Sequence, residues 1–225
     1  MRSAFAHIDC WIFDLDNTLY PPETELFAQV DQRMGAFIAQ YLGVDRHEAR
    51  RIQKRYFADY GTTLNGLMAQ HGLDPQTYLD YVHDIDHSVV PADPALDTAL
   101  GRLDGRKLVF TNGTVKHAEQ VMKRLGITRH FSDIHDIAAG DYQPKPKPAA
   151  YERLLARTGI APRQAAMFED IGRNLQVPHA LGMATVLVRT EHPHPDRGFG
   201  LLGDGGEPYV DHVTDDLAGF LARLA

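Results

Sequence analysis

Short, almost continuous runs of apolar residues alternate along this chain with stretches whose apolar residues recur at helical spacing. The runs lie at 8–13, 108–110, 165–168 and 185–188, with a weaker one at 134–137, and the helical stretches at 115–125, 151–155 and about 174–181. Such short runs are typical of strands buried on both faces of a parallel sheet, which the helical stretches would cover. The pattern predicts an α/β protein with a Rossmann-like, three-layer αβα core.

Residues 21–90 interrupt this alternation, because they contain helical patterns and no clear strand run. Helices are expected at about 26–42 and 47–60, and from near Leu64 and Pro75. Gly43 is a typical helix stop. We therefore predict a core domain made of 1–20 and 91–225, with a small all-helical cap, 21–90, inserted after the first strand.

Proline-rich segments mark the remaining boundaries. Pro21-Pro22 and Pro91–Pro94 are the expected hinges of the cap. The segment Pro193–Pro208 is rich in Gly and Pro and predicts a surface loop. An edge strand at about 209–213 and a helix through 217–224 would close the chain.

Charge and composition limit the classes of partner. The 225 residues include 23 Lys and Arg against 30 Asp and Glu, a net charge of −7 with His neutral, which disfavours binding to nucleic-acid polymers. The hydrophobic fraction of 44% is that of a globular protein. No continuous apolar stretch is as long as that of a signal peptide or of a membrane span. The single Cys10 lies in an apolar run and suits a packing role. We expect a soluble, cytoplasmic monomer or homodimer.

Asp14 and Asp16 directly follow the first apolar run. Two positions apart on an extended chain, they face the same side, with Cα atoms roughly 6 to 7 Å apart. Carboxylates this close need a positive partner, and Mg²⁺, which prefers oxygen ligands, would supply it. Such pairs also occur in solvated turns, so the other motifs must decide between the two interpretations.

Thr111-Asn112-Gly113 follows the second run and precedes a helical stretch. Its hydroxyl and backbone N–H groups could cradle a phosphate oxygen, or they could simply cap the helix. Glu169 and Asp170 follow the third run and either complete a metal site or cap the next helix.

Prolines on both sides of Lys145 and Lys147 fix the backbone before a helix expected to begin near Pro148. A lysine held in this way could reach back over the site, whereas the alternative is a solvated basic linker.

Taken together, these motifs resemble those of the haloacid dehalogenase (HAD) superfamily of phosphotransferases, in the family's order and over essentially the whole chain. The resemblance implies that Asp14 is the nucleophile, which forms an aspartyl-phosphate, and that Asp16 is the general acid and base. Dehalogenating members lack the second Asp and use no Mg²⁺, so dehalogenation is disfavoured.

The same resemblance implies the remaining roles. Thr111 and Lys145 would hold the transferring phosphoryl group, with Asn112 and Gly113 binding phosphate. The Mg²⁺ ligands would be Asp14, Asp16 and Asp170, with Glu169 a direct or indirect ligand. Lys145 fits the family's Lys-Pro-x-Pro run, which leaves Lys147 as a solvated neighbour.

Within the superfamily, the cap resembles that of the pyrimidine 5′-nucleotidase branch. This resemblance implies a phosphatase for nucleoside 5′-monophosphates, with candidate substrate contacts at Tyr60, Thr62, Thr63, Asn65 and His83. Tyr60 and the two Thr residues could instead only start the next cap helix.

Three other activities stay open: a phosphatase for another small phosphorylated metabolite such as a sugar phosphate or phosphoglycolate, a phosphomutase, and a catalytically silent binding module. His83 and His87 are four residues apart, but no third ligand follows at a recognised metal spacing. The other ten histidines are expected at the surface.

Overall fold

The computed structural model describes residues 2–189 and 205–224. The chain divides into two compact units, one formed by Met1–Thr24 with Val90–Ala225 and the other by Glu25–Val89. The helical segment inserted after the first strand is thus a unit of its own, and the larger unit carries the sheet.

A six-stranded sheet forms the centre of the larger unit, in the order β3-β2-β1-β4-β5-β6, with every neighbouring pair parallel. The strands are β1 (Cys10–Phe13), β2 (Arg106–Phe110), β3 (Asp133–His135), β4 (Ala165–Glu169), β5 (Ala184–Val188) and β6 (His212–Thr214). Each of the four apolar runs forms a strand, and the weaker run forms the edge strand β3.

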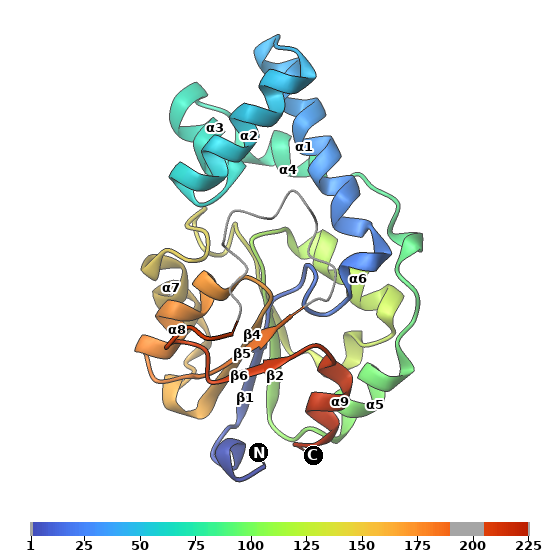
Figure 1. Ribbon diagram of the computed structural model, residues 1–225, viewed down its shortest axis with the longest axis vertical. Coiled ribbons are helices and arrows are strands. Elements are labelled where there is room, and N and C mark those ends of the chain that lie inside the picture. Colours follow the sequence, from blue (N-terminus) through green and yellow to red (C-terminus); the bar gives the residue numbers. More distant parts are fainter. Residues whose placement is uncertain (1, 190–204, 225) are drawn as a thin grey trace. The chain divides into compact units, whose positions relative to one another are not determined.

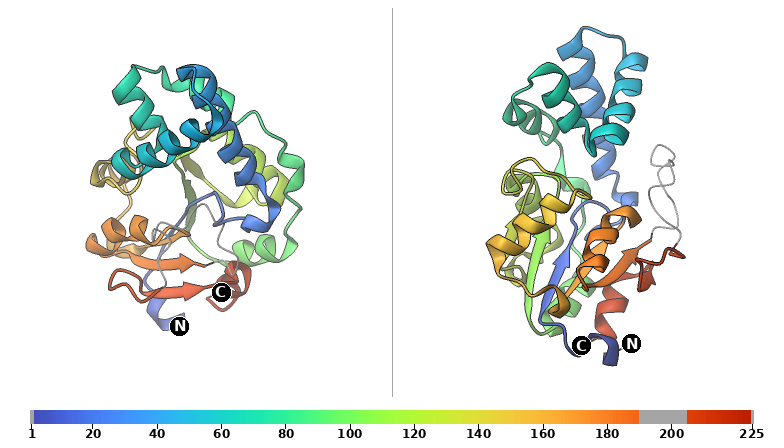
Figure 2. Two further views of the ribbon diagram at one scale, coloured as in Figure 1. Left: turned by 45° about the horizontal axis from the view of Figure 1, so that its top comes forward. Right: turned by 90° about the vertical axis from the view of Figure 1, so that its left-hand side faces the viewer.

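Helices cover both faces of this sheet, as a right-handed parallel topology requires. They are α5 (Pro94–Arg102), α6 (Val115–Leu125), α7 (Pro148–Thr158), α8 (Gln176–Ala180) and α9 (Leu217–Ala222), with short 3-10 turns at Arg2–Phe5, Pro22–Thr24, Thr128–His130, Pro162–Gln164 and Gly172–Leu175. Helices α7 and α8 lie on one face, and α5, α6 and α9 on the other (Figures 1 and 2). The predicted three-layer αβα core is confirmed.

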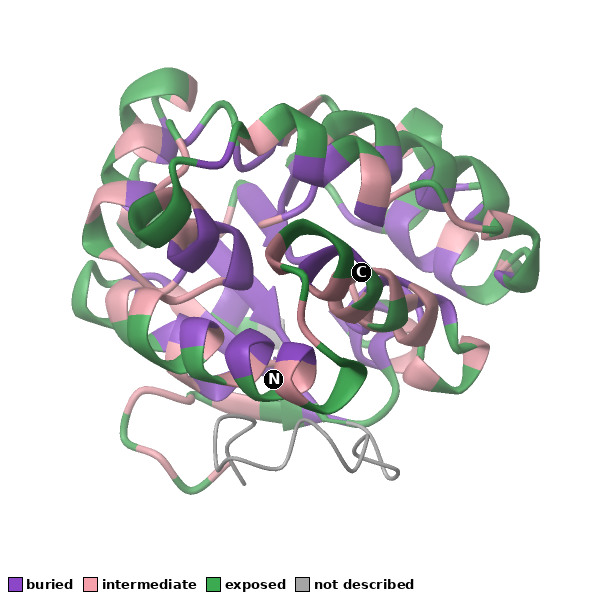
Figure 3. Cartoon of the chain, turned by 90° about the horizontal axis from the view of Figure 1, so that it is seen from above, coloured by how far each residue is buried: buried purple, intermediate pink, exposed green. Residues whose placement is uncertain are grey.

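The central strands β1 and β4 are buried on both faces (Figure 3). On the α7 side, Ile12 and Phe110 pack against Tyr151 and Leu154. On the α9 side, the rings of Phe13 and Phe168 stack with centroids 4.7 Å apart. This core fixes the ends of β1, β2 and β4 relative to one another.

The smaller unit consists of α1 (Leu26–Leu42), α2 (Arg46–Tyr60), α3 (Thr63–His71) and α4 (Pro75–Val82), followed by a 3-10 turn at His87–Val89. Helix α1 ends at Gly43, which has a left-handed φ of 65°. Helices α2 and α3 approach closely at Gly66, where a Cβ would lie 2.3 Å from Tyr56 Cγ. The four predicted cap helices are present.

Two sequence expectations near the C-terminus fare differently. The last strand lies at His212–Thr214, so it begins three residues later and ends one residue later than the expected 209–213. The expected loop Pro193–Pro208 lies largely outside the described residues. No helix in the two described ranges is long and apolar enough to cross a membrane.

Candidate active site

Asp14 follows the central strand β1 at the point where the chain order of the sheet reverses. From β1 the neighbouring strands are β2 on one side and β4 on the other, and open α/β sheets bind ligands at the carboxyl ends of strands at such a point. The amide of Asp14 still donates to Phe168 O at 2.9 Å, which holds Asp14 close to β4.

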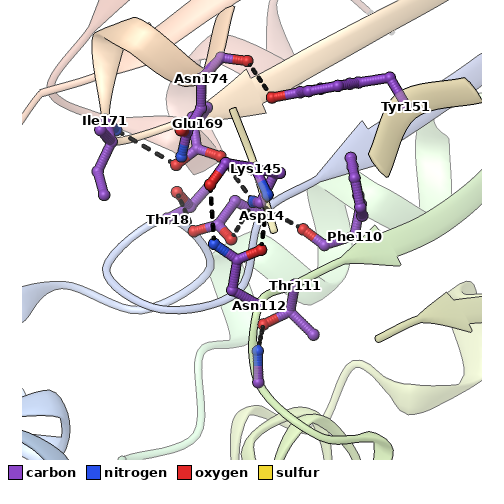
Figure 4. A network of polar contacts seen from close by, with 11 residues as sticks. Asp14, Thr18, Phe110, Thr111, Asn112, Lys145, Tyr151, Glu169, Ile171 and Asn174 are labelled. Atoms are coloured by element: carbon purple, nitrogen blue, oxygen red, sulfur yellow. Dashed lines mark hydrogen bonds and ion pairs between the residues drawn. The ribbon is translucent and has the colours of Figure 1, made fainter. Parts of the chain in front are cut away.

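Lys145 joins the carboxyl ends of three strands (Figure 4). Its Nζ donates to Asp14 Oδ1 at 2.6 Å, to Glu169 Oε2 at 2.7 Å and to Phe110 O at 2.8 Å. The side chain is only 1% exposed, so this ammonium has exchanged its hydration for three protein oxygens. Lys147 is only partly buried and contributes none of these contacts.

Burial and mutual repulsion govern the titration of the carboxylates. Burial, reinforced by the Glu169 charge and opposed by Lys145, raises the pKa of Asp14 to about 7. Burial also raises the pKa of Glu169 to about 7, although Lys145 opposes this shift. For Lys145, burial works to lower the pKa, but the two carboxylates more than offset it and hold the pKa above its usual range. Lys145 therefore stays charged at neutral pH.

Asp14, Glu169 and Asp170 form a group that could hold a metal ion, with one oxygen from each lying within 4.8 Å of the others. It is the one such group in the described part of the chain. All three residues are at most 6% exposed, and Lys145 contacts the carboxylates of Asp14 and Glu169. Three buried carboxylates this close together offer the oxygen ligands that a hard divalent cation prefers.

Asp16 is not part of this group, contrary to our expectation that its side chain would be a metal ligand. Its Oδ1 instead accepts hydrogen bonds from Tyr20 Oη at 2.5 Å and from His117 Nε2 at 3.0 Å. β1 ends at Phe13, so Asp14 and Asp16 follow the strand and do not lie on it. The charge of Asp16 nevertheless acts on the Asp14 carboxylate and helps to raise its pKa.

Asn112 and Gly113 have partners other than those expected of a phosphate cradle. The Asn112 side chain makes two hydrogen bonds with the backbone of Lys145, accepting from its N at 2.9 Å and donating to its O at 3.3 Å. The Gly113 amide donates to Thr111 Oγ1 at 2.9 Å. Helix α6 begins only at Val115, with Thr114 as its N-cap. Asn112 thus holds the backbone of Lys145 in place.

A family model for haloacid dehalogenase-like hydrolases matches residues 8–182, which contain every residue of the site described above. The chain belongs to this family. The HAD-like hydrolase is 29% identical over 195 residues to Phosphate metabolism protein 8 of Saccharomyces cerevisiae, an alignment that covers 79% of this chain and 60% of the relative. Enolase-phosphatase E1 of Frankia alni is 34% identical over 93 residues, 40% of this chain and 39% of the relative. The chain spans less than two thirds of the length of these relatives.

Solved structures share the fold of this HAD-like hydrolase. L-2-haloacid dehalogenase from Xanthobacter autotrophicus superposes with a TM-score of 0.56 at 17% identity, covering 96% of this chain and 98% of the other. A haloacid dehalogenase-like hydrolase from Streptococcus pneumoniae gives a TM-score of 0.59 at 16% identity, covering 98% and 100%. Identities this low show a common fold and no more.

The candidate substrate contacts all lie in the smaller unit, where each has a partner within that unit. Thr62 is the N-cap of α3, accepting from Asn65 N at 3.1 Å and donating to Asn65 Oδ1 at 2.6 Å. Thr63 is buried and donates to Gln53 O at 3.2 Å. Thr62 therefore serves the start of α3, which was the alternative interpretation, and Thr63 joins α3 to α2.

Tyr60 and His83 also have neighbours inside the smaller unit. The hydroxyl of Tyr60 accepts a hydrogen bond from Gln70 Nε2, and His83 Nδ1 contacts Leu79 O at 3.0 Å. Both rings are partly exposed, so unlike Thr63 they keep surface on which a ligand could lie.

The expectation that the other histidines lie at the surface is wrong for two of them. His117 is 1% exposed and His135 is fully buried. Burial, aided by the Arg157 charge, lowers the pKa of His135 to about 4, and its Nδ1 accepts from Arg157 Nε at 3.0 Å. His192 and His194 lie outside the described residues.

Sequence reasoning missed several polar residues of the site. Thr18 Oγ1 donates to Asp14 Oδ2 at 3.2 Å, and Tyr151 Oη donates to Asn174 O at 2.6 Å, above Glu169 in Figure 4. Asn17 adopts a left-handed φ of 61°, and its Nδ2 is buried with no hydrogen-bond partner among the described residues. The signal for Thr18 and Asn17 is their place in the stretch that already contains Asp14.

Proposed function

We propose that this HAD-like hydrolase is a Mg²⁺-dependent phosphomonoesterase that acts through a phosphoenzyme on Asp14. The observation that carries the proposal is the contact of Lys145 Nζ with Asp14, beside the carboxylates of Glu169 and Asp170. A nucleophile, a fixed cation and an oxygen-rich metal site at one strand end are the parts that phosphoryl transfer needs.

In the first step, a carboxylate oxygen of Asp14 attacks phosphorus and the bond from phosphorus to the ester oxygen breaks. Asp16 gives its proton to the departing oxygen. In the second step, Asp16 takes a proton from water, which attacks the same phosphorus. Inorganic phosphate then leaves and Asp14 is regenerated.

The chain's own residues prepare this reaction. Lys145 fixes the rotamer of Asp14 and brings positive charge to the place where phosphoryl oxygens gain charge. Thr111, which is 2% exposed and directly follows β2, is the proposed second phosphate contact. A Mg²⁺ ion held by Asp14, Glu169 and Asp170 would screen the repulsion between the Asp14 carboxylate and the phosphate.

The proposed substrates are nucleoside 5′-monophosphates, with pyrimidine nucleotides first among them. Support comes from the resemblance of the cap sequence to the pyrimidine 5′-nucleotidase branch, and from a relative whose name refers to phosphate metabolism. Tyr60 and His83 offer partly exposed rings for a base, and Asn65 an amide, whereas Thr63 is withdrawn from the set because it is buried.

A panel of phosphate esters assayed with Mg²⁺ and with EDTA tests the proposal. We expect Mg²⁺-dependent phosphate release that is fastest with nucleoside monophosphates, and no turnover by Asp14→Asn at unchanged circular dichroism. Equal rates on generic esters would reject the nucleotide assignment, and transfer of the phosphoryl group to a second sugar phosphate would indicate a mutase. Absence of hydrolysis of every ester would leave a binding module.

A further inference from the structure

We propose that His117 and Tyr20 are positioning residues that hold the carboxylate of Asp16, so that its Oδ2 is the oxygen that gives and takes the proton. The inference rests on the proposed function. It adds two residues to the machinery, one of them from helix α6, which neither the sequence motifs nor the similarity to known proteins had assigned.

Both contacts converge on one oxygen atom. Asp16 Oδ1 lies 2.5 Å from Tyr20 Oη and 3.0 Å from His117 Nε2. A carboxylate oxygen has two lone-pair directions, and a hydroxyl and a ring N–H that both donate to Oδ1 occupy them. A proton carried by Asp16 is then located on Oδ2.

The two donors are themselves held firmly. Tyr20 is 1% exposed, and the His117 side chain is fully buried, whereas the Asp16 side chain retains 17% exposure. Thr114 caps α6 and accepts a hydrogen bond from the amide of His117 at 3.2 Å, which fixes the first helical turn. Rigid donors against a partly exposed carboxylate are the arrangement expected where a side chain must keep one orientation.

The location of His117 links two motifs that are far apart in the sequence. Helix α6 follows β2 and Thr111, and Asp16 follows β1, so His117 fixes the acid relative to the β2 end that carries the proposed phosphate contact. An acid displaced by a fraction of an ångström loses much of its effect on a departing oxygen. The contribution of His117 should therefore depend on how strongly the leaving group needs a proton.

The test is single-turnover rapid quench, which measures the rate of phosphoenzyme formation separately from hydrolysis. Two substrates are compared at saturation: an alkyl phosphate such as a nucleoside monophosphate, whose leaving oxygen needs a proton, and p-nitrophenyl phosphate, whose leaving group departs as an anion. For His117→Ala and Tyr20→Phe we expect the rate of phosphoenzyme formation from the alkyl ester to fall by about 10-fold or more. General acid catalysis as a whole contributes roughly 10²- to 10⁴-fold, so this is a part of its effect. The loss with the aryl ester should be several-fold smaller.

Three further variants make the result specific. In His117→Gln the amide Nε2 can replace the ring donor, so most of the rate with the alkyl ester should return. In an Asp16→Asn background, His117→Ala should cost nothing more, because the residue it positions is gone. His130→Ala removes another histidine contact to an aspartate, that of Nε2 with Asp97 at 2.7 Å, and should behave as wild type. His130 lines a cavity with Asp9 and Cys10 at the opposite end of the strands.

The positioning role would be overturned if the variants lost the same factor of rate with both esters, or lost none. It would also be overturned if His117→Ala lowered the rate of the Asp16→Asn variant by the same factor as that of the wild type. If the wild-type protein forms no phosphoenzyme with any ester, the proposed function falls and this inference with it. A wild-type protein that forms a phosphoenzyme while His117→Ala is unchanged removes this inference alone.

Discussion

Lys145 is the residue on which the charge balance of the site depends. Its ammonium contacts two buried carboxylates, and the pKa of each is raised to about 7 even with the lysine in place. Removing a single partner from such a cluster leaves a buried charge without compensation. This lowers the free energy of unfolding more than replacing the whole cluster with apolar residues would.

We expect Lys145→Met to abolish turnover and to lower the free energy of unfolding by about 3–5 kcal/mol at pH 8 without metal. The loss should shrink at pH 5, because Asp14 and Glu169 are protonated below a pKa of about 7. Urea unfolding at the two pH values measures both effects. The matched control is Lys147→Met, at a half-buried side chain two residues away, which should change stability by less than about 0.5 kcal/mol. Similar losses in the two variants would refute the assignment of Lys145.

At the residue scale, only some residues of the candidate site could be predicted from the sequence. Asp14, Glu169 and Asp170 could be named because they lie at or directly after strand ends, and the carboxyl ends of parallel strands meet at one edge of the sheet. His117 could not, because its partner Asp16 lies 101 residues away and a single sequence contains no record of that contact. Its only local signal was a polar ring on the apolar face of α6, which fits a structural histidine equally well.

At the scale of elements, Asn112 joins the end of β2 to the segment that leads into α7. Its side-chain amide pairs with the backbone N–H and C=O of Lys145 much as a neighbouring strand would. The position of the Lys145 backbone thus depends on a residue of another loop.

We expect Asn112→Ala to cost about 1–3 kcal/mol of stability, since it leaves polar groups of the Lys145 backbone without these bonds, and to slow turnover by about 10-fold or more. Chemical denaturation and steady-state kinetics on one preparation provide both numbers. Asp93→Ala is the control, because it removes the N-cap of α5, whose Oδ1 accepts from Leu96 N at 2.9 Å. It should cost about 1 kcal/mol with no change in kcat. A loss of turnover in both variants would mean that reduced stability alone slows the enzyme.

Central elements were easier to predict than peripheral ones. Strands β1, β2, β4 and β5 are buried on both faces, so their apolar runs are nearly continuous. The edge strands β3 and β6 have three residues each and are only partly buried, which leaves too few apolar positions to define their limits. The helix expected at about 174–181 is divided between a 3-10 turn and the five-residue α8.

For the whole molecule, the carboxylates couple stability to pH and to metal binding. The folded-state pKa of Asp14 and of Glu169 is raised from about 4 to about 7, so the folded protein keeps protons that the unfolded chain has lost. In the absence of metal, these groups therefore lower the free energy of unfolding as pH rises from about 4 to 7.

Mg²⁺ binding should reverse this trend, because it needs the carboxylates without protons. We expect the rise in melting temperature with Mg²⁺ to be larger at pH 8 than at pH 6, and stabilisation at 100 times Kd to be about 2.7 kcal/mol. Differential scanning fluorimetry with a Mg²⁺ titration measures this, and Asp170→Asn should lose most of the shift. A Mg²⁺ effect that is larger at pH 6 would contradict the assignment.

The central place of β1 in the sheet has a consequence during synthesis. Asp14 leaves the ribosome well before its partners, because β1 pairs with β2 and with β4, and Glu169, the second partner of Lys145, follows Asp14 by 155 residues. At about 5–20 residues per second a ribosome needs roughly 8–31 s to make that stretch. Throughout this interval the nascent chain carries the proposed nucleophile without the complete set of its partners. Under the proposed mechanism, no phosphate ester is then attacked before the sheet is complete.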